Sequence, residues 1–152
     1  MRRKLPDYMR EFPEWDRTQL IIKSFYATYN ELGYGFLESV YRNALAGELR
    51  ELGMHVVLEA PTEVLFRGRS VGMFRVDVIV DGCVIVELKA GAQLGPTDKR
   101  QLLNYLRSTR LDVGLLLHYG PKPSFQRVVS PRVILLPHAT HPASSGESGT
   151  SG

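Results

Sequence analysis

The sequence predicts a single α/β domain of the α+β type, in which helices flank a mixed sheet. Three observations support this prediction. Two early segments repeat apolar residues every three or four positions, as amphipathic helices do. Short runs rich in valine and isoleucine follow, separated by turns that contain glycine. A further helical segment separates these strands from two later ones, so helices and strands are expected to pack in layers around one core.

The two early helices are predicted over residues 14–32 and 36–52. Gly33 and Gly53 follow them, and glycine is a common residue just after a helix. In the second helix the apolar side chains form one stripe, made of Leu37, Val40, Tyr41, Ala44, Leu45, Leu49 and Leu52. Both helices are therefore expected to pack against a sheet.

Strands are predicted where runs of β-branched residues lie between turn residues. Four are predicted before the next helix, at Met54–Glu59, Thr62–Arg67, Val71–Val80 and Cys83–Ala90. Pro96-Thr97-Asp98 then opens a helix that ends near Arg107, because proline is favoured in the first turn. Two more strands are predicted at Val113–Leu117 and Val128–Leu136. The predicted order is α-α-β-β-β-β-α-β-β, and the sheet begins as an antiparallel meander.

Length and composition limit the classes of protein to consider. The chain has 152 residues, of which 43% are hydrophobic and 23% charged, as in one globular domain. We expect this domain to span residues 1–136, followed by a disordered Pro/Ser/Gly-rich tail over 137–152. No apolar run reaches the roughly 18 residues of a membrane-spanning helix, and Met1 begins no signal-peptide pattern, so we expect a cytoplasmic protein with no membrane partner. The single cysteine, Cys83, excludes an intrachain disulfide.

Charged residues lie within two of the most apolar strands. Val84-Ile85-Val86 is typical of a strand covered on both faces, yet Glu87 and Lys89 continue it on one face. Asp77 stands among apolar neighbours in the preceding strand. A buried charge needs a partner. The ordinary interpretation is an exposed strand end with a salt bridge, and the alternative is a site that holds a metal ion.

The turn between these two strands decides whether Asp77 and Glu87 share a face. A two-residue turn at Asp81-Gly82 would put the two carboxylates on opposite faces. A three-residue loop, Val80-Asp81-Gly82, pairs Asp77 with Ile85 and puts both carboxylates on one face. The sequence favours the longer loop, because the glycine adopts a positive φ without strain.

Two carboxylates that converge on one point suit a hard divalent cation such as Mg²⁺ or Mn²⁺. Lys89 beside them is placed to hold a phosphate oxygen or to lower the pKa of an attacking water. This combination is typical of phosphodiester hydrolysis. The charge distribution agrees, since residues 1–87 carry 11 basic and 13 acidic side chains whereas residues 88–152 carry 8 and 3. The second half of the chain is the better candidate to face phosphates.

These motifs together resemble the PD-(D/E)XK nuclease superfamily, which has a restriction-endonuclease-like αβββαβ core. Asp77 precedes Glu87-Leu88-Lys89 by nine intervening residues, after one helix and before another. Upstream, Gly35-Phe36-Leu37-Glu38-Ser39-Val40-Tyr41-Arg42 is similar to the pattern of the GxxExxxR family within that superfamily. Val76 stands where the superfamily name has its proline. The resemblance extends over roughly residues 18–130.

The resemblance implies roles for further residues. Glu38 is expected as a third acidic metal ligand, directly or through water, and Arg42 one turn later as the residue that orients it. Gln101 and Tyr105, four apart on the later helix, are expected to line the active site. Each position also has an ordinary interpretation: a helix-start carboxylate, a surface ion pair, and a polar helix face with a half-buried tyrosine.

The sequence therefore predicts a Mg²⁺-dependent or Mn²⁺-dependent nuclease acting on DNA or RNA, with Asp77, Glu87, Lys89, Glu38, Gln101 and Tyr105 in the site. A catalytically silent nuclease-fold module that binds nucleic acid or a protein partner is the alternative. A third possibility is an interaction domain, in which the helices of residues 14–52 form the surface of a homo-oligomer.

Overall fold

The computed structural model describes residues 12–134. Its first two helices are α2 (Trp15–Leu32) and α3 (Glu38–Glu51), which confirms both early helices of the sequence analysis. The helix after the strands is α4 (Pro96–Ser108), and it begins at the proline as expected. No helix within the described range is both long and apolar enough to cross a bilayer. The expected tail, residues 137–152, lies outside the described residues.

Five strands form one mixed sheet in the order β1-β2-β3-β4-β5. Their bounds are Val56–Phe66, Arg69–Val80, Val84–Ala90, Val113–Tyr119 and Ser124–Val129. All neighbouring pairs are antiparallel except β3 and β4, which are parallel and are connected through α4. A parallel pair needs such a crossover, since its second strand must start at the same end as the first. The predicted α/β class with a mixed sheet is confirmed.

Two predicted strand boundaries were wrong. The expected break near Ala60-Pro61 is absent, and β1 runs through it as one strand of 11 residues. Because β1 is an edge strand, its proline removes no N–H that a second neighbour would need. The segment predicted as a strand from Val128 instead ends β5 at Val129 and turns at Ser130 into the short helix α5 (Pro131–Ile134). Proline at the first helical position favours that turn.

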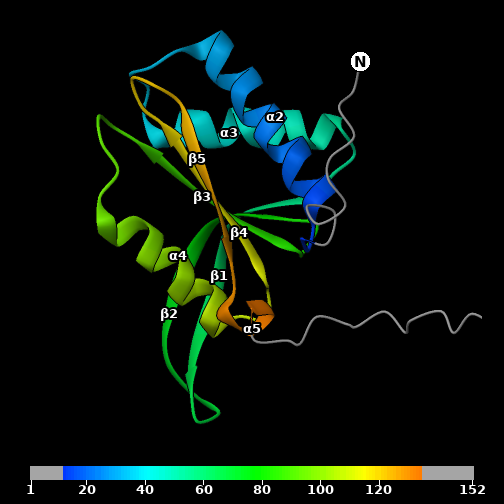
Figure 1. Ribbon diagram of the computed structural model, residues 1–152, viewed down its shortest axis with the longest axis vertical. Coiled ribbons are helices and arrows are strands. Elements are labelled where there is room, and N and C mark those ends of the chain that lie inside the picture. The colour runs from blue at the N-terminus through cyan, green and yellow to red at the C-terminus, as the bar shows by residue number, and fades with distance from the viewer. Residues whose placement is uncertain (1–11, 135–152) are drawn as a thin grey trace, which may run out of the picture.

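The helices cover the two faces of the sheet. The α2 and α3 side chains, including Phe25 and Leu45, pack with the even-numbered residues of β3 in one core cluster. Leu102 and Leu106 of α4 pack on the opposite face. Figure 1 shows α4 lying apart from the α2–α3 pair, across the central strands. At Gly114 of β4 an added Cβ would come within 2.8 Å of Leu102, so glycine lets α4 approach the sheet closely.

The strands β1 and β2 extend well beyond the rest of the sheet. β2 pairs with β3 only over Val78–Val80, so its earlier residues pair with β1 alone. We call this two-stranded segment, residues 61–75, the β1–β2 ribbon. Its turn at Arg67-Gly68 has φ values of 50° and 76°, and the ribbon projects from the body at the bottom of Figure 1.

Candidate active site

The β2–β3 hairpin places Asp77 opposite Glu87. Val80 pairs with Val84 and Val78 with Val86, so the next positions along the two strands are the two acids. The connecting loop has three residues, Asp81 to Cys83, which confirms the predicted loop length and the shared face. Its predicted position was wrong, because the loop starts one residue later than expected and Asp77 therefore lies opposite Glu87 instead of Ile85.

Local hydrogen bonds explain this later start. Asp81 and Gly82 both have positive φ, at 52° and 63°, and the Cys83 N–H closes the turn onto the Val80 carbonyl at 2.9 Å. The left-handed conformation costs a non-glycine residue about 1 kcal/mol. The Asp81 carboxylate offsets this cost by accepting hydrogen bonds from the His55 N–H at 2.7 Å and from Arg17 at 2.8 Å.

The two carboxylates take the place of backbone pairing where the strands separate. The Asp77 N–H donates to Glu87 Oε1 at 3.3 Å, and the Leu88 N–H donates to Asp77 Oδ2 at 3.0 Å. The regular side-chain alternation of β2 is interrupted here: Val76 packs in the cluster on the α4 face and Val78 in the cluster on the other. Such interruptions are common beside active sites, because they redirect a side chain.

The electrostatics of this pair are unusual. Glu87 is buried, with only 5% of its surface exposed. Burial first, and the negative charge of Asp77 second, raise the pKa of Glu87 to about 8. At neutral pH the pair therefore retains a proton, and a cation placed between the two carboxylates would displace it.

Lys89 lies on the same face of β3, beside His118 of the parallel strand β4. Its ammonium group is 3.8 Å from Asp98 Oδ1 in the first turn of α4. The other oxygen of Asp98 accepts the Gly95 N–H at 2.8 Å, so this carboxylate joins the lysine to the start of the helix. The charge of Lys89 also lowers the pKa of Glu87, in opposition to the larger effect of burial.

Glu38 comes near the pair without joining it. It is the first residue of α3, and burial followed by the charge of Asp77 raises its pKa, while Lys89 and the Ala90 N–H act in the opposite direction. Among residues 12–134 no three Asp, Glu, His or Cys side chains converge closely enough to enclose a metal ion. The structure thus brings two of the three predicted acids into contact and leaves the third within electrostatic range.

Arg42 does not form the expected bridge to Glu38. Its guanidinium group lies 3.6 Å from Glu59 of β1, across the gap between α3 and the sheet. Glu59 has a positive φ of 49° opposite Asp77, between the ladder pairs Leu58–Val78 and Ala60–Val76. The expectation that Arg42 orients Glu38 was therefore wrong, since the two residues are one turn apart but the arginine points to the sheet.

Tyr105 of α4 lies within electrostatic range of the carboxylate pair, and Gln101 contacts its hydroxyl. The Gln101 amide donates to the Tyr105 hydroxyl at 2.6 Å. The tyrosine ring stacks on Phe74 of β2, with ring centres 4.0 Å apart and planes 4° from parallel. Burial raises the pKa of Tyr105, and the negative charges of Glu87 and Asp77 raise it further. The helix therefore turns a hydrogen-bonding hydroxyl toward the two acids.

Two residues that shape this site were not predicted from the sequence. Phe74 holds the Tyr105 ring. The sequence feature that could have indicated Phe74 is an aromatic residue three positions before Asp77, on a segment that is otherwise exposed. His118 of β4 lies beside Lys89, and its Nε2 is 2.8 Å from the carbonyl of Gly91, which follows β3. The position of His118 beside Lys89 follows from the parallel register of β3 and β4. This register can be predicted only when it is known which strand lies next to β3.

Comparison with protein-family models gives a match over residues 15–128 to the PD-(D/E)XK nuclease superfamily. The chain belongs to the PD-(D/E)XK nuclease superfamily. Two helices followed by a five-stranded mixed sheet with an inserted helix agree with the restriction-endonuclease-like fold of this superfamily. Its members typically use a divalent metal ion, and the superfamily implies a nucleic acid as the partner.

Solved structures and curated sequences add little to this assignment. The crystal structure of SSO0001 matches with a TM-score of 0.46 and 20% sequence identity, and the match covers 78% of this chain. This chain spans 60% of that protein. No curated protein sequence shows a significant match.

Proposed function

We propose that this PD-(D/E)XK protein is a metal-dependent nuclease, of the GxxExxxR branch, that hydrolyses phosphodiester bonds of nucleic acid. The observation that carries the proposal is the contact between Asp77 and Glu87, where burial and mutual repulsion raise the pKa of Glu87 to about 8. A fold gains nothing in stability from a buried acid in contact with a second acid. A divalent cation relieves their repulsion, and this supports a binding role for the pair.

The donor set fits a hard cation such as Mg²⁺ or Mn²⁺. Carboxylate oxygens of Asp77 and Glu87 would hold the ion, with Glu38 as the third acid directly or through water. When bound, such an ion supplies charge neutralisation at the phosphate and a more acidic water. The remaining positions on a Mg²⁺ ion are usually filled by water and by substrate oxygens, so two protein ligands are sufficient.

The neighbouring side chains divide the other tasks. The Lys89 ammonium is placed to stabilise the negative charge that grows on a non-bridging phosphate oxygen. The Tyr105 hydroxyl and the Gln101 amide are placed to donate hydrogen bonds to the phosphate or to the attacking water. Asp98 keeps Lys89 extended toward the start of α4, which orients the ammonium before substrate arrives.

A catalytically silent nucleic-acid-binding module is the second candidate. The observation that favours it is the ion pair of Lys89 with Asp98, because a lysine already paired is less free to act on a phosphate. The two candidates differ in what Glu87 does: in the nuclease it binds the cation, whereas in the silent module it only retains a proton.

The test is cleavage of end-labelled single-stranded DNA, duplex DNA and RNA with Mg²⁺ or Mn²⁺, and with EDTA as the metal-free control. Glu87→Gln, which keeps the side-chain volume, and Glu87→Ala are compared with Glu51→Ala at the exposed end of α3. Metal-dependent cutting that both Glu87 variants lose and Glu51→Ala retains supports the nuclease. Equal inertness of wild type and variants on every substrate would overturn it in favour of the silent module.

A further inference from the structure

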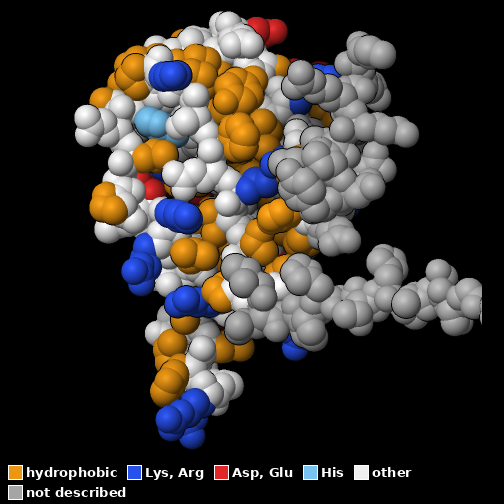
Figure 2. Space-filling model, viewed as in Figure 1, with side chains coloured by type: hydrophobic (Ala, Val, Ile, Leu, Met, Phe, Trp, Pro, Cys, Tyr) orange, Lys and Arg blue, Asp and Glu red, His pale blue; other side chains and the backbone are white. Residues whose placement is uncertain are grey.

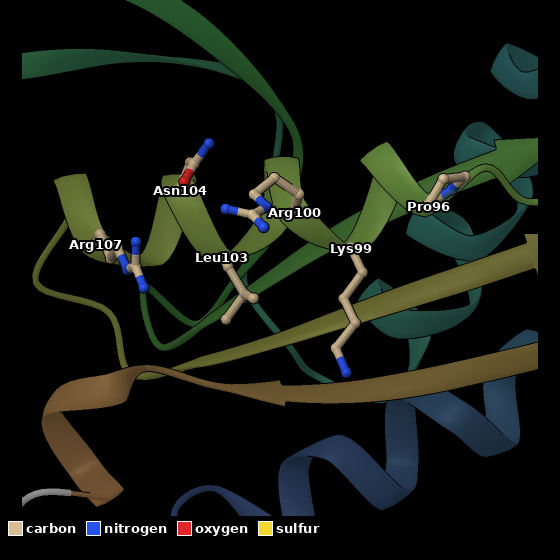
Figure 3. Close-up of a pocket in the computed structure, with 6 residues that line it drawn as sticks. All are labelled: Pro96, Lys99, Arg100, Leu103, Asn104 and Arg107. Atoms are coloured by element: carbon tan, nitrogen blue, oxygen red, sulfur yellow. The ribbon is translucent and has the colours of Figure 1, made fainter.

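One flank of α4 carries a cluster of cations around a shallow pocket. Lys99, Arg100 and Arg107 line it together with Pro96, Leu103 and Asn104, and the pocket has a volume of about 380 Å³. Figure 3 shows these side chains projecting from successive turns of the one helix. At a rise of about 1.5 Å per residue, the cations extend over about 12 Å of the helix.

Nothing in the described part of the chain neutralises these three cations. Arg17, Arg42, Lys89 and Arg132 each lie within ion-pair distance of a carboxylate. Lys99, Arg100 and Arg107 have no such partner among residues 12–134, and all three are exposed. The only acid of α4, Asp98, is turned toward Lys89. A row of exposed, unpaired cations is a surface that attracts a polyanion.

Helix geometry connects this basic face with the candidate active site. Consecutive residues are about 100° apart around a helix, so Gln101 lies about 100° from Arg100, and Asn104 lies between them. Asn104 and Gln101 are both exposed, whereas Leu102 and Leu106 on the other side are buried. The exposed surface of α4 is therefore continuous from the cations, past the amide of Asn104, to the Gln101–Tyr105 pair beside the two acids.

The β1–β2 ribbon provides a second basic region. Arg67 and Arg69 flank its turn, and Phe66 lies under the Arg67 guanidinium at 5.1 Å. Leu65, Phe66, Val71 and Met73 are all more than half exposed. Figure 2 shows Lys and Arg side chains over α4 and again at the ribbon tip, with apolar side chains along the ribbon between them.

The ribbon is anchored beside α4 and reaches away from it. The Phe74–Tyr105 stack fixes its base, and Arg69 is five residues further along β2. At about 3.4 Å per strand residue the tip lies about 17 Å beyond the stack. The major groove of B-form DNA is about 12 Å wide and admits a two-stranded ribbon. A nucleic acid that contacts both α4 and the ribbon tip therefore spans a distance greater than the width of one groove.

We propose that the nucleic acid bound by this protein is double-stranded, with one phosphate backbone along Lys99, Arg100 and Arg107 of α4 and the β1–β2 ribbon in the adjacent groove. This inference rests on the proposed function, since it assigns the substrate class of the same site. A single strand would need only one row of cations, whereas two basic regions separated by an apolar ribbon match the two backbones that border a groove. The exposed ribbon apolar residues then contact base edges or sugars.

The experiment measures binding in EDTA, so that cleavage does not enter. A fluorescent duplex and a single strand of the same sequence and length are titrated by anisotropy at several salt concentrations. The variants are Lys99→Gln/Arg100→Gln/Arg107→Gln on α4 and Arg67→Gln/Arg69→Gln on the ribbon. Lys23→Gln, an exposed cation of α2, is the control, and thermal unfolding verifies that each variant is folded.

The expected result is tighter binding of the duplex than of the single strand, with at least a tenfold weaker duplex affinity for the α4 variant. Each phosphate contact contributes about 0.9 to the slope of log affinity against log salt, so the α4 variant should lose about 2 to 3 units of slope. Lys23→Gln should leave both quantities unchanged. Equal affinity for single strand and duplex, or an unchanged slope in the α4 variant, would overturn the proposal.

Two outcomes separate this inference from the proposed function. Duplex binding through α4 in a protein that never cuts would retain the inference and reject the nuclease. Cutting by a protein whose duplex affinity is indifferent to the α4 and ribbon variants would retain the nuclease and reject the inference. Self-association that depends on the exposed ribbon residues, with no nucleic-acid binding, would identify the ribbon as an interface between copies of the chain and reject both.

Discussion

The β1–β2 and β2–β3 hairpins have the same backbone conformation at their turns but different surroundings. Arg67-Gly68 and Asp81-Gly82 each place a non-glycine residue and then a glycine at positive φ. Asp81 is held by Arg17 and by the His55 N–H, and its hairpin enters the body of the sheet. Within the described residues Arg67 forms no side-chain hydrogen bond or ion pair, only the cation–π contact with Phe66, and its hairpin projects. The turn sequence sets the backbone conformation, and the surroundings decide whether the hairpin supports a site or extends from the body.

The difference has a chemical consequence. The anchored hairpin brings Asp77 and Glu87 together because the Asp81 turn fixes the register between β2 and β3. The β1–β2 ribbon has no such requirement, and opposite its Glu63 lies an apolar residue, Met73. Carboxylates on the anchored hairpin are therefore expected to matter for chemistry, and one on the ribbon is expected to matter little.

The largest expected effect is on cleavage. Asp77→Asn should lower metal-dependent cleavage at least about 100-fold, because an amide is a weaker ligand for a hard cation and removes charge from the site. Glu63→Gln is the matched control: it makes the same carboxylate-to-amide change on the ribbon and should stay within about threefold of wild type. Initial rates under saturating metal compare the two. A similar loss in both variants would remove the distinction between the hairpins.

The next effect is the pH dependence of stability. The pKa of Glu87 is raised to about 8 in the folded protein, above its ordinary value of 4.5, so the folded state binds the proton more tightly than the unfolded state does. The contribution of the Glu87 proton to the free energy of unfolding is therefore fully present below the unfolded pKa. It is lost as pH rises from about 4.5 to about 8. Glu87→Gln, which has no proton to lose, should reduce this fall by a few kcal/mol across the window. Urea unfolding at several pH values measures it.

The effect of Mg²⁺ on thermal stability tests the same ionisation of Glu87. The ion binds the ionised pair, so it should raise the Tm of the wild type more at about pH 8 than at about pH 5, and should leave the Tm of Glu87→Gln nearly unchanged. An equal Mg²⁺ effect in the wild type and in Glu87→Gln would place the ion elsewhere. A wild-type stability that does not change between these pH values would show that Glu87 is ionised without a metal.

Much of this fold could be predicted because its signals are local. The apolar stripes of α2 and α3 and the Pro96 start of α4 depend on neighbouring residues only. The loop length between β2 and β3 also followed from Asp81-Gly82, and with it the shared face of the two acids. The loop position did not, because the Asp81 conformation is stabilised by Arg17, which is 64 residues away in the sequence.

The site residues depended more on contacts between distant segments. Asp77 and Glu87 were found because two charges interrupt apolar strands, which is a local anomaly. The Arg42–Glu59 ion pair and the Phe74–Tyr105 stack join residues 17 and 31 positions apart, and no periodicity encodes them. The expected bridge from Arg42 to Glu38 was wrong for this reason: helical spacing gives neighbours on the same helix and says nothing about competing partners on the sheet.

A smaller effect is expected when the anchor of the first hairpin is removed. Asp81→Ala deletes the acceptor for the His55 N–H and for Arg17 and leaves a β-carbon at positive φ, which should cost about 2 kcal/mol. Cleavage should fall along with stability, because the register that aligns the two acids loses its support. Chemical denaturation measures the first effect, and a stability within about 0.5 kcal/mol of wild type would show that the turn is determined by Gly82 alone.

The smallest effect, and the sharpest comparison, comes from glycine at the two equivalent turn positions. Arg67→Gly relieves the left-handed strain at φ 50° and removes only the cation–π contact with Phe66, so stability should rise by a few tenths of a kcal/mol or stay unchanged. Asp81→Gly relieves the same strain at φ 52° but loses both anchoring hydrogen bonds, so stability should fall by about 1 kcal/mol. Opposite signs for the same substitution, measured by the same denaturation experiment, would show that the surroundings and not the turn sequence distinguish the hairpins. A fall of similar size in both variants would show instead that the ribbon turn is held as firmly as the one beside the acids.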